Sequence, residues 1–424
     1  MDKKVFCAKK GLKGTIIIPS DKSISHRAVM FSSLAKGKSV VKNFSNGHDP
    51  QSTLKICKTL GAEIEFTSDS LIINSSGTFI PPIKELDCGN SGTTMRLMSG
   101  ILAGQDFDSV LIGDESLSKR PMKRIIEPLT QMGANIESEN YSAPLKIKGS
   151  KLNGIDYKSN IASAQVKSSI LLAGLFADGV TSITEPYLSR NHTELMLSYM
   201  GADIQINGYK TTIQKSSLEP RTIEIPGDIS SAAFFIAAAL IVSDSEIILK
   251  NVGLNPNRTG IIDVVKRMGA DIEILDKKVI SNEIVGDIKI KTTGLTACEI
   301  SGEDIPRLID EIPVIAVLAT QADGTTVIKN AEDLRNKESD RIAAIVKELR
   351  KLGANIEETQ DGMIIHGGTK LKGGAELETY NDHRLAMSLY VAGLICENEI
   401  LIKGFEWVNI SFPEFEELFN RLIP

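Results

Sequence analysis

Cationic side chains recur at the beginnings of apolar segments in this sequence. Lys22, Arg27, Arg96, Lys167 and Arg384 each fall in the first turns of a segment that has the composition of a buried helix. The helix dipole disfavours positive charge at that end. A cation there becomes favourable when an anion binds between it and the free backbone N–H groups. If these segment starts converge, the pattern predicts a cleft that binds anions.

Each of these apolar segments also begins with residues that can cap a helix. Ser, Asp and Asn are the preferred N-cap residues, and for the cluster at Asp228 simple capping is the favoured interpretation. Capping explains the short polar side chains but not the cations beside them. The clusters are Ser20–Ser23, Asn90–Thr93, Ser163–Gln165, Asp228–Ser231, Asp310–Glu311 and Asn381–Arg384.

Other charged or titratable residues carry weaker signals. The basic run at 116–124, SLSKRPMKR, reads by default as a solvated surface. Lys337 and Arg341 share one helix face beside Glu338, because residues four apart are neighbours on a helix. The five histidines show no metal-ligand spacing, so we expect no metal. No phosphate-binding GxxxxGK(S/T) loop or helix-opening GxGxxG is present.

A short pattern, (L/M)GA followed by alternating residues, recurs five times. It predicts a helix that ends in a left-handed glycine and leads into a strand. The copies begin at Leu60, Met132, Met200, Met268 and Leu352.

The apolar segments interleave with this pattern. They begin near Ser25, Thr93, Gln165, Ser230, Glu311 and Asp382, about 70 residues apart. A helix that is apolar on all sides must be covered on all sides. The sequence therefore predicts six α/β repeats, each with one buried helix, one amphipathic helix and several short strands. The long period and the alternating strands favour two halves of three repeats over a solenoid, with the boundary near residues 224–231.

Composition narrows the function classes. The formal net charge of −6 argues against a nucleic-acid partner. The five cysteines are scattered without a CxxC pair, which favours a reducing, cytoplasmic setting. The first residues lack the apolar core of a signal peptide. The most apolar run, Ala232–Val242, is too short to span a membrane and is better read as a buried helix.

Seven segments of the chain carry specific motifs: PSDKSISHRA (19–28), GNSGTTMRL (89–97), LSKRPM (117–122), ASAQVKSSILLAGL (162–175), IDEIPVIAVLAT (309–320), RNKESDRI (335–342) and NDHRLAM (381–387). Together they resemble the family of 5-enolpyruvylshikimate-3-phosphate synthases along essentially the whole chain. That resemblance implies two inside-out α/β domains, each of three βαβαββ repeats, joined by a double hinge. The lower domain would take residues 1–20 and 227–424, the upper domain 21–226, with the active site in the cleft between them.

The resemblance implies a reaction between two anions. The enolpyruvyl group of phosphoenolpyruvate would pass to the 5-hydroxyl of shikimate 3-phosphate by addition and elimination, as a step of aromatic amino-acid biosynthesis. Asp310 would take the hydroxyl proton and Glu338 would protonate the methylene carbon, assisted by Lys22 and His383. By position, the phosphoenolpyruvate site would comprise Lys22, Asn90, Gly92, Arg120, Gln165, Arg341 and Arg384; the shikimate 3-phosphate site would comprise Lys22, Ser23, Arg27, Ser163, Gln165, Arg190, Asp310 and Lys337.

The resemblance also implies a cytoplasmic monomer that needs no cofactor, and domains that close on their substrates. It implies sensitivity to glyphosate, because the family's resistant members carry a bulkier residue at the position of Gly92. Three positions depart from the pattern. Ile410 stands where some members have Lys, Asp333 where some have Asn, and Leu97 where others have Pro.

Two alternative functions must be weighed against this one. The sister enolpyruvyl transferase that acts on UDP-N-acetylglucosamine shares the fold, but it carries a reactive Cys in the loop that corresponds to 113–121. The loop here, GDESLSKRP, has no Cys. A non-catalytic repeat scaffold predicts no special residues at helix starts, contrary to the distribution of cations.

Overall fold

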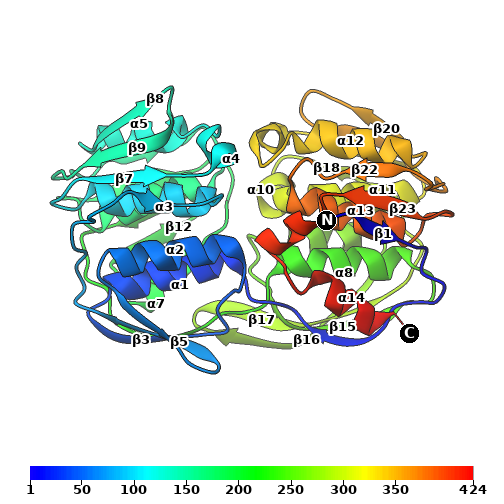
Figure 1. Ribbon diagram of the computed structural model, residues 1–424, viewed down its shortest axis with the longest axis horizontal. Coiled ribbons are helices and arrows are strands. Elements are labelled where there is room, and N and C mark those ends of the chain that lie inside the picture. Colours follow the sequence, from blue (N-terminus) through cyan, green and yellow to red (C-terminus); the bar gives the residue numbers. More distant parts are fainter. Residues whose placement is uncertain (424) are drawn as a thin grey trace. The chain divides into compact units, whose positions relative to one another are not determined.

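Each sequence repeat folds into a small mixed β-sheet with its helices. In the computed structural model, which describes residues 1–423, the chain separates into two units, and each has its own apolar core (Figure 1). Unit 1 comprises Met1–Pro19, Pro226–Val279 and the chain from Ile284 onward. Unit 2 comprises Ser20–Ile225 and the short segment Ile280–Glu283.

Unit 2 contains three four-stranded sheets of identical topology. In each, the first two strands are parallel and the other pairings are antiparallel. Two of the three sheets follow the βαβαββ chain order that the family resemblance implies, and the third takes its first strand from the far end of the unit. In sheet order, the strands are β14 (Thr222–Glu224), β3 (Gly37–Lys42), β5 (Ser70–Ser75) and β4 (Glu63–Phe66); β6 (Leu86–Asp87), β7 (Ser109–Ile112), β9 (Ser142–Lys148) and β8 (Asn135–Glu139); and β10 (Asp156–Lys158), β11 (Thr181–Thr184), β13 (Lys210–Ile213) and β12 (Ile204–Asn207).

Unit 1 repeats this plan, and its last sheet has three strands. That sheet is completed by the N-terminal strand, which pairs antiparallel with β23. In sheet order, the strands are β16 (Asp271–Ile280), β17 (Glu283–Lys291), β15 (Glu246–Gly253) and β2 (Lys13–Ile17); β18 (Glu299–Ile300), β19 (Thr325–Ile328), β21 (Met363–His366) and β20 (Asn355–Glu358); and β1 (Lys3–Val5), β23 (Ile400–Lys403) and β22 (Glu376–Glu378).

At the first two points where the chain passes from one unit to the other, the last strand before the crossing belongs to the unit that the chain leaves. Strand β2 stays in unit 1 beside β15, although the helix that follows it lies in unit 2. Strand β14 stays in unit 2 beside β3, although the helix that follows it lies in unit 1. In addition, the tip of the β16–β17 hairpin is docked in unit 2, where the His192 Nδ1 lies 2.6 Å from the Glu283 Oε1.

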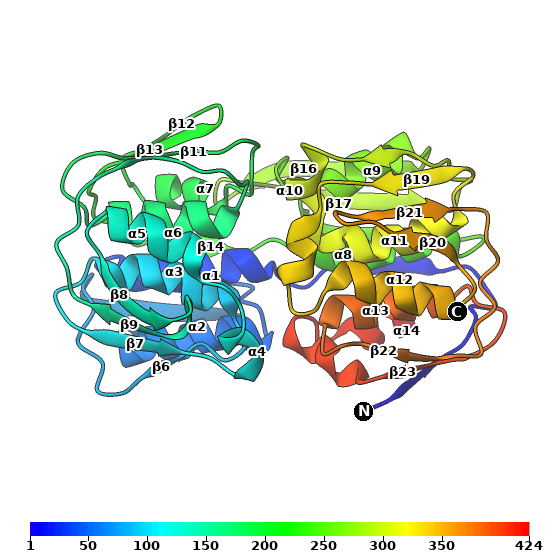
Figure 2. The ribbon, with the colours of Figure 1, turned by 90° about the horizontal axis from the view of Figure 1, so that it is seen from above.

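Six apolar helices form the centres of the two units, three in each. In unit 2, α3 packs against both α1 and α6 (Figure 2). In unit 1, α8, α11 and α13 pack against one another. Their starts lie within three residues of the predicted ones: α1 (Lys22–Leu34), α3 (Gly92–Ala103), α6 (Ala164–Gly174), α8 (Ile229–Ile241), α11 (Ile312–Gln321) and α13 (His383–Gly393).

Side-chain caps begin five of these helices, as the polar clusters predicted. The prediction is wrong for α11, because its N-cap residue Glu311 makes no side-chain cap hydrogen bond. The carboxylate of Asp21 accepts from the Ile24 N–H at 2.8 Å, and that of Asp228 accepts from the Ser230 N–H at 2.8 Å. The capping interpretation for the Asp228 cluster is therefore confirmed. The remaining caps are Ser91, Ser163 and Asp382.

The predicted left-handed glycines end all five helices of the second type. Gly61, Gly133, Gly201, Gly269 and Gly353 have φ between +86° and +100°, a region that a residue with a Cβ enters only at a cost. These helices are α2 (His48–Thr59), α5 (Lys123–Gln131), α7 (His192–Tyr199), α9 (Gly260–Arg267) and α12 (Arg341–Lys351). The remaining helices are α4 (Glu115–Ser118), α10 (Asp304–Leu308) and α14 (Phe415–Leu422), with 3₁₀ turns at Ile309–Glu311, Glu332–Asn336 and Phe405–Ile410.

The most apolar helix, α8, is a core helix, as predicted: its residues from Ile229 to Leu240 are buried. Within the described part of the chain, no helix combines the length and apolar character needed to cross a membrane.

Candidate active site

The first candidate group lies at the start of α3 in unit 2. The Arg120 Nη2 donates to the Asn90 Oδ1 at 2.7 Å, and the Asn90 Nδ2 donates to Asp114 at 2.7 Å. Gly92 opens the helix beside them. The structure thus brings together Asn90, Gly92 and Arg120, three of the residues predicted for phosphoenolpyruvate.

Arg96 joins this group to the start of α6. Its Nη1 donates to the Gln165 Oε1 at 2.8 Å, and a Cβ added to Gly92 would lie 2.7 Å from the same Nη1 and 3.5 Å from the Arg120 Nη1. Gly92 does not have a positive φ, so its backbone does not require glycine. What glycine provides here is space for the two guanidinium groups.

Lys22 occupies the first turn of α1, where its Nζ lies 3.0 Å from Asp49 Oδ2. Both side chains are largely buried, and 17% of the Lys22 side chain is exposed. Asp49 was not predicted from the sequence; it lies 27 residues away in α2, and no local spacing connects the two.

A second group in unit 2 is centred on Arg27, which is buried in α1. Its Nε donates to Thr193 Oγ1 at 2.7 Å, its Nη2 to Ser168 Oγ at 2.9 Å and its Nη1 to the Ser23 carbonyl at 2.9 Å. The Arg190 Nη1 donates to the Ser23 Oγ at 3.3 Å. Ser23, Arg27 and Arg190, all predicted for shikimate 3-phosphate, therefore lie together.

All direct partners of Arg27 are neutral oxygens; among residues 1–423 no carboxylate forms an ion pair with it. Burial is the main reason that the pKa of Arg27 falls to about 10, which still leaves the group charged at neutral pH. A buried guanidinium without a bound counter-charge is well suited to hold an anion. Ser163, the remaining predicted contact in this unit, caps α6 through the Val166 N–H at 3.5 Å.

Lys167 does not fit the interpretation given to the other helix-start cations. Its Nζ lies 2.7 Å from Glu185 and 2.8 Å from Glu194, and all three side chains are buried. Two carboxylates from the protein already occupy the place of the expected anion. The inclusion of Lys167 among anion-seeking cations is therefore wrong, because residues distant in sequence neutralise it.

In unit 1, Arg341 is surrounded by carboxylates at the start of α12. Its Nε lies 2.8 Å from Asp382, its Nη2 2.6 Å from Glu338 and its Nη1 3.2 Å from Asp310. Burial alone would lower the pKa of Arg341, but the charges of Asp382, Glu338 and Asp310 outweigh burial and raise it. Asp310, Glu338 and Arg341, predicted for proton transfer and binding, form one cluster.

Lys337 borders this cluster. Its Nζ lies 3.9 Å from Asp310 and 3.3 Å from Asp333. Asp333, where some family members have Asn, thus contributes a carboxylate to the lysine that is predicted to hold shikimate 3-phosphate.

The start of α13 adds two predicted residues to unit 1. His383 is buried in the first turn, and the Arg384 Nη1 lies 3.9 Å from the Glu311 Oε1. Glu311 also lies 3.4 Å from Arg258 Nη1 and accepts from Ser230. Arg258 and Glu311 were not identified as site residues; they come from different elements, and only their packing reveals the network.

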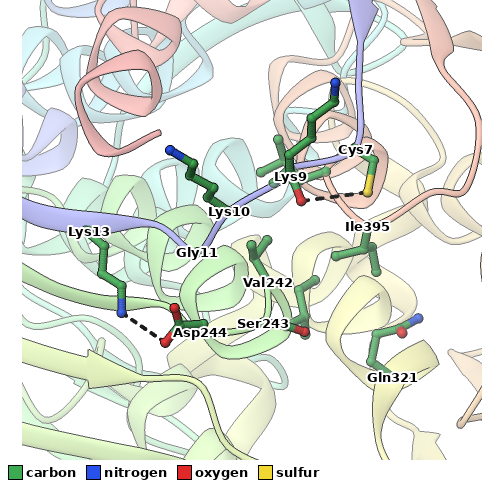
Figure 3. Close-up of a pocket in the computed structure, with 13 residues that line it drawn as sticks. Cys7, Lys9, Lys10, Gly11, Lys13, Val242, Ser243, Asp244, Gln321 and Ile395 are labelled. Atoms are coloured by element: carbon green, nitrogen blue, oxygen red, sulfur yellow. Dashed lines mark hydrogen bonds and ion pairs between the residues drawn. The ribbon is translucent and has the colours of Figure 1, made fainter. Parts of the chain in front are cut away.

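A surface pocket in unit 1 lies at the C-terminal ends of α8, α11 and α13 (Figure 3). Its lining includes Val242 after α8, Gln321 at the end of α11 and Ile395 after α13. Lys13 there is paired with Asp244 at 3.2 Å. None of the predicted site residues lines this pocket. Among residues 1–423, no group of three or more His, Cys, Asp and Glu side chains is arranged to hold a metal ion.

Comparison with known protein families gives one consistent result. A family model described as "EPSP synthase (3-phosphoshikimate 1-carboxyvinyltransferase)" matches residues 7–419. A protein of Thermoanaerobacter sp. (strain X514) named 3-phosphoshikimate 1-carboxyvinyltransferase is 55% identical over 417 residues, covering 98% of each chain. A protein of the same name from Bacillus subtilis (strain 168) is 52% identical over 418 residues, covering 97% of each.

Solved structures agree with this result. EPSP synthase from Acinetobacter baumannii superimposes with a TM-score of 0.88 at 42% identity, covering 99% of this chain and 98% of that one. The enolpyruvyl transferase NikO from Streptomyces tendae superimposes with a TM-score of 0.81 at 16% identity, covering 99% and 96%. The second similarity concerns the fold alone.

Proposed function

The chain belongs to the EPSP synthase family, and from that membership we propose how its residues carry out the family's reaction. The enzyme transfers the carboxyvinyl group of phosphoenolpyruvate to the 5-hydroxyl of shikimate 3-phosphate and releases phosphate, a step of aromatic amino-acid biosynthesis. Both substrates carry a phosphate and a carboxylate. The protein must therefore offset their mutual repulsion with cations in a site that excludes water.

For phosphoenolpyruvate, we propose contacts from both units. Unit 2 supplies Lys22, Asn90, Gly92, Arg120 and Gln165, and unit 1 supplies Arg341 and Arg384. The position of Gly92 supports this, because the absence of a Cβ leaves room beside two guanidinium groups. Arg suits the planar carboxylate and the phosphate, since its donors form a fixed fork.

For shikimate 3-phosphate, the observation that carries the proposal is the environment of Arg27. Among residues 1–423, this buried guanidinium is hydrogen-bonded only to neutral groups, and it lies with Ser23 and Arg190. We assign the phosphate of the substrate to this group. Lys22 lies on the same helix as Arg27, and Ser163 and Gln165 lie at the start of α6, the helix that carries Ser168; we propose that all three also contact this substrate. Asp310 of unit 1 would hold the ring hydroxyls, and Lys337 of unit 1 would supply a further contact to the same substrate.

The proposed chemistry is an addition followed by an elimination. Asp310 accepts the proton of the 5-hydroxyl as its oxygen attacks the central carbon of phosphoenolpyruvate. Glu338 donates a proton to the methylene carbon, which gives a tetrahedral intermediate. In the elimination, Glu338 takes one proton back from the new methyl group as the bond to phosphate breaks, which restores the double bond, and Asp310 returns its proton to the departing phosphate. Lys22 and His383 assist by stabilising developing charge.

The other enolpyruvyl transferase reaction, on UDP-N-acetylglucosamine, is disfavoured. The family model and the relatives at 52–55% identity carry the shikimate activity in their names, and the loop at 113–121 has no Cys. We further propose a cytoplasmic monomer. Isolated cysteines support the reducing compartment, and the solution mass of the native protein tests the oligomeric state.

The test measures phosphate released from phosphoenolpyruvate in the presence of either acceptor. We expect release with shikimate 3-phosphate and none with UDP-N-acetylglucosamine. Lys22→Ala should lose turnover while staying folded, because losing a buried charge-assisted contact costs about 1.5–3 kcal/mol in binding and more in the transition state. Asp49→Asn, which removes the partner of Lys22 but keeps the lysine, should retain most of the activity. A folded Lys22→Ala variant with normal turnover would overturn the assignment.

A further inference from the structure

A buried ionic cluster lies next to the proposed shikimate 3-phosphate contacts in unit 2. Lys167 on α6 contacts Glu185, which directly follows β11, and Glu194 on α7, at 2.7 and 2.8 Å. The Lys167 Nζ also donates to the Ser189 carbonyl at 3.4 Å. Each of the three ionic side chains is at most 4% exposed. A single ammonium group thus ties one helix to a strand end, a loop and a second helix.

The cluster is joined to Arg27 through neighbouring residues. Ser168 follows Lys167 on α6, and Thr193 precedes Glu194 on α7. Their hydroxyl oxygens lie 2.6 Å apart, and both accept from Arg27, at 2.9 and 2.7 Å. The Lys167–Glu194 ion pair therefore holds together the two helices that orient the Arg27 guanidinium.

The cluster also fixes the loop that carries Arg190. This loop runs between β11 and α7, and Lys167 contacts it at Glu185 and at Ser189, the residue before Arg190. Arg190 in turn donates to Ser23 at 3.3 Å. Lys167 itself is buried and paired with two carboxylates, and we assign it no direct substrate contact.

Charge gives a second reason for the arrangement. One ammonium and two carboxylates leave a surplus negative charge inside the unit, which is costly unless other cations balance it. Arg27 is such a cation, and Glu194 acts on it favourably. The cluster thereby helps a buried guanidinium to remain charged without placing a carboxylate where an anion would bind.

We propose that Lys167 is a positioning residue for shikimate 3-phosphate, which holds Arg27 and Arg190 in the arrangement that receives the substrate phosphate. This inference rests on the assignment of Arg27 and Arg190 made above. It predicts an effect that is specific for one substrate, because phosphoenolpyruvate is assigned to other residues. A purely structural ion pair would instead affect both substrates alike or neither.

The test compares steady-state kinetics of Lys167→Met and Lys167→Arg with those of wild type. Lys167→Met removes the charge at similar side-chain length, and kcat/KM for shikimate 3-phosphate should fall roughly 10- to 100-fold, since small misplacements of a binding group have effects of that size. KM for phosphoenolpyruvate should change less than about threefold, as expected when only the positioning of the other substrate's contacts is lost. Lys167→Arg should recover most of the loss.

Two further variants keep the test decisive. Lys167→Met/Glu185→Gln keeps the net charge of the cluster at −1, as in wild type, and it replaces the single variant if that one does not fold. Lys351→Met is the matched control, because Lys351 also pairs with a buried carboxylate, Glu348, at 2.7 Å, in unit 1. It should lower stability and leave KM for shikimate 3-phosphate unchanged.

A double-mutant cycle with Arg190→Ala tests the positioning role of Lys167 separately from the assignment of Arg27 and Arg190 to shikimate 3-phosphate. If Lys167 acts through the loop, its substitution should have a smaller effect when Arg190 is absent. Normal KM for shikimate 3-phosphate in Arg27→Met and Arg190→Ala would contradict the site assignment. Raised KM in those variants, with Lys167→Met unchanged or equally impaired toward both substrates, would overturn the positioning role.

Discussion

His26 is buried in α1 between the proposed contacts Lys22 and Arg27. Its Nδ1 lies 2.6 Å from the Thr53 Oγ1, and among residues 1–423 its Nε2 has no hydrogen-bond partner. Burial, followed by the charges of Lys22 and Arg27, holds the pKa of His26 well below its usual value of 6.5. The folded protein therefore keeps this imidazole neutral where the unfolded chain would protonate it.

Stability should fall in acid because of this histidine. Below pH about 6.5 the unfolded chain binds a proton at His26 and the folded chain does not. The contribution of His26 to the free energy of unfolding is therefore present above that pH and is lost as the pH falls, by about 1.4 kcal/mol per pH unit. His26→Gln should remove this part of the slope, and exposed His48→Gln should not. Urea unfolding from pH 7.5 to 5.5 measures it; equal slopes for wild type and His26→Gln would contradict the prediction.

Gly92 is the residue at which inhibitor sensitivity should change. Wild type should be inhibited by glyphosate. In Gly92→Ala the new Cβ would displace the Arg96 Nη1, which lies 2.7 Å away and holds Gln165. Inhibition should weaken about tenfold, equivalent to losing one charge-assisted contact, with a smaller loss of phosphoenolpyruvate binding because the inhibitor is longer. Inhibition curves and melting temperatures measure this.

The conformation of Gly92 separates two explanations for its presence. Because its φ is not positive, alanine should not strain the backbone, and the melting temperature should not fall. A lower melting temperature together with equal weakening of both ligands would indicate a backbone role. A wild-type enzyme that glyphosate does not inhibit would contradict the prediction itself.

At the scale of elements, a left-handed glycine ends each of the five helices of the second type. Gly269 ends α9 with φ +89°, and a Cβ there would meet only the Gly294 carbonyl oxygen, at 3.7 Å. Gly269→Ala should therefore cost only backbone strain, about 1–2 kcal/mol of the free energy of unfolding. Gly294 provides the matched control, because it is also exposed, lacks a positive φ and has open space around its Cβ position.

Denaturant unfolding of the two variants tests this prediction. Gly294→Ala should leave stability unchanged or raise it by up to about 1 kcal/mol, since alanine restricts the unfolded chain. Equal stability of Gly269→Ala and Gly294→Ala would show that the left-handed conformation does not limit the repeat. The same reasoning applies to the glycines that end α2, α5, α7 and α12.

At the scale of the whole molecule, the proposed contacts of each substrate come from both units. Ligands shift an open–closed equilibrium only when closure adds contacts, so shikimate 3-phosphate together with glyphosate or phosphoenolpyruvate should compact the protein. Small-angle scattering with and without ligands measures the radius of gyration. Lys337→Ala, which removes one contact assigned to unit 1, should reduce the ligand-induced change; no compaction of wild type at saturating ligand would contradict closure.

Many helices and turns of this protein could be predicted from its sequence, because they depend on interactions between neighbouring residues. The apolar helices, their Ser and Asp caps and the left-handed glycines depend on residues within a few positions of one another, and the structure forms them where the patterns indicated. The family motifs likewise are contiguous segments. For the same reason the sequence could nominate Arg27, Gln165 and Arg341 individually without showing what each one contacts.

Partners that come from distant segments were decided only by the tertiary structure. Lys167 resembled an anion-binding cation until packing placed Glu185 and Glu194 beside it. The placement of strands β2 and β14 at the crossings and the docked hairpin tip at Ile280–Glu283 also have no local signal. Periodicity and capping act over a few residues. The neutralisation of a buried charge depends on which segments the fold brings within a few ångströms, and that is settled only when all of them pack together.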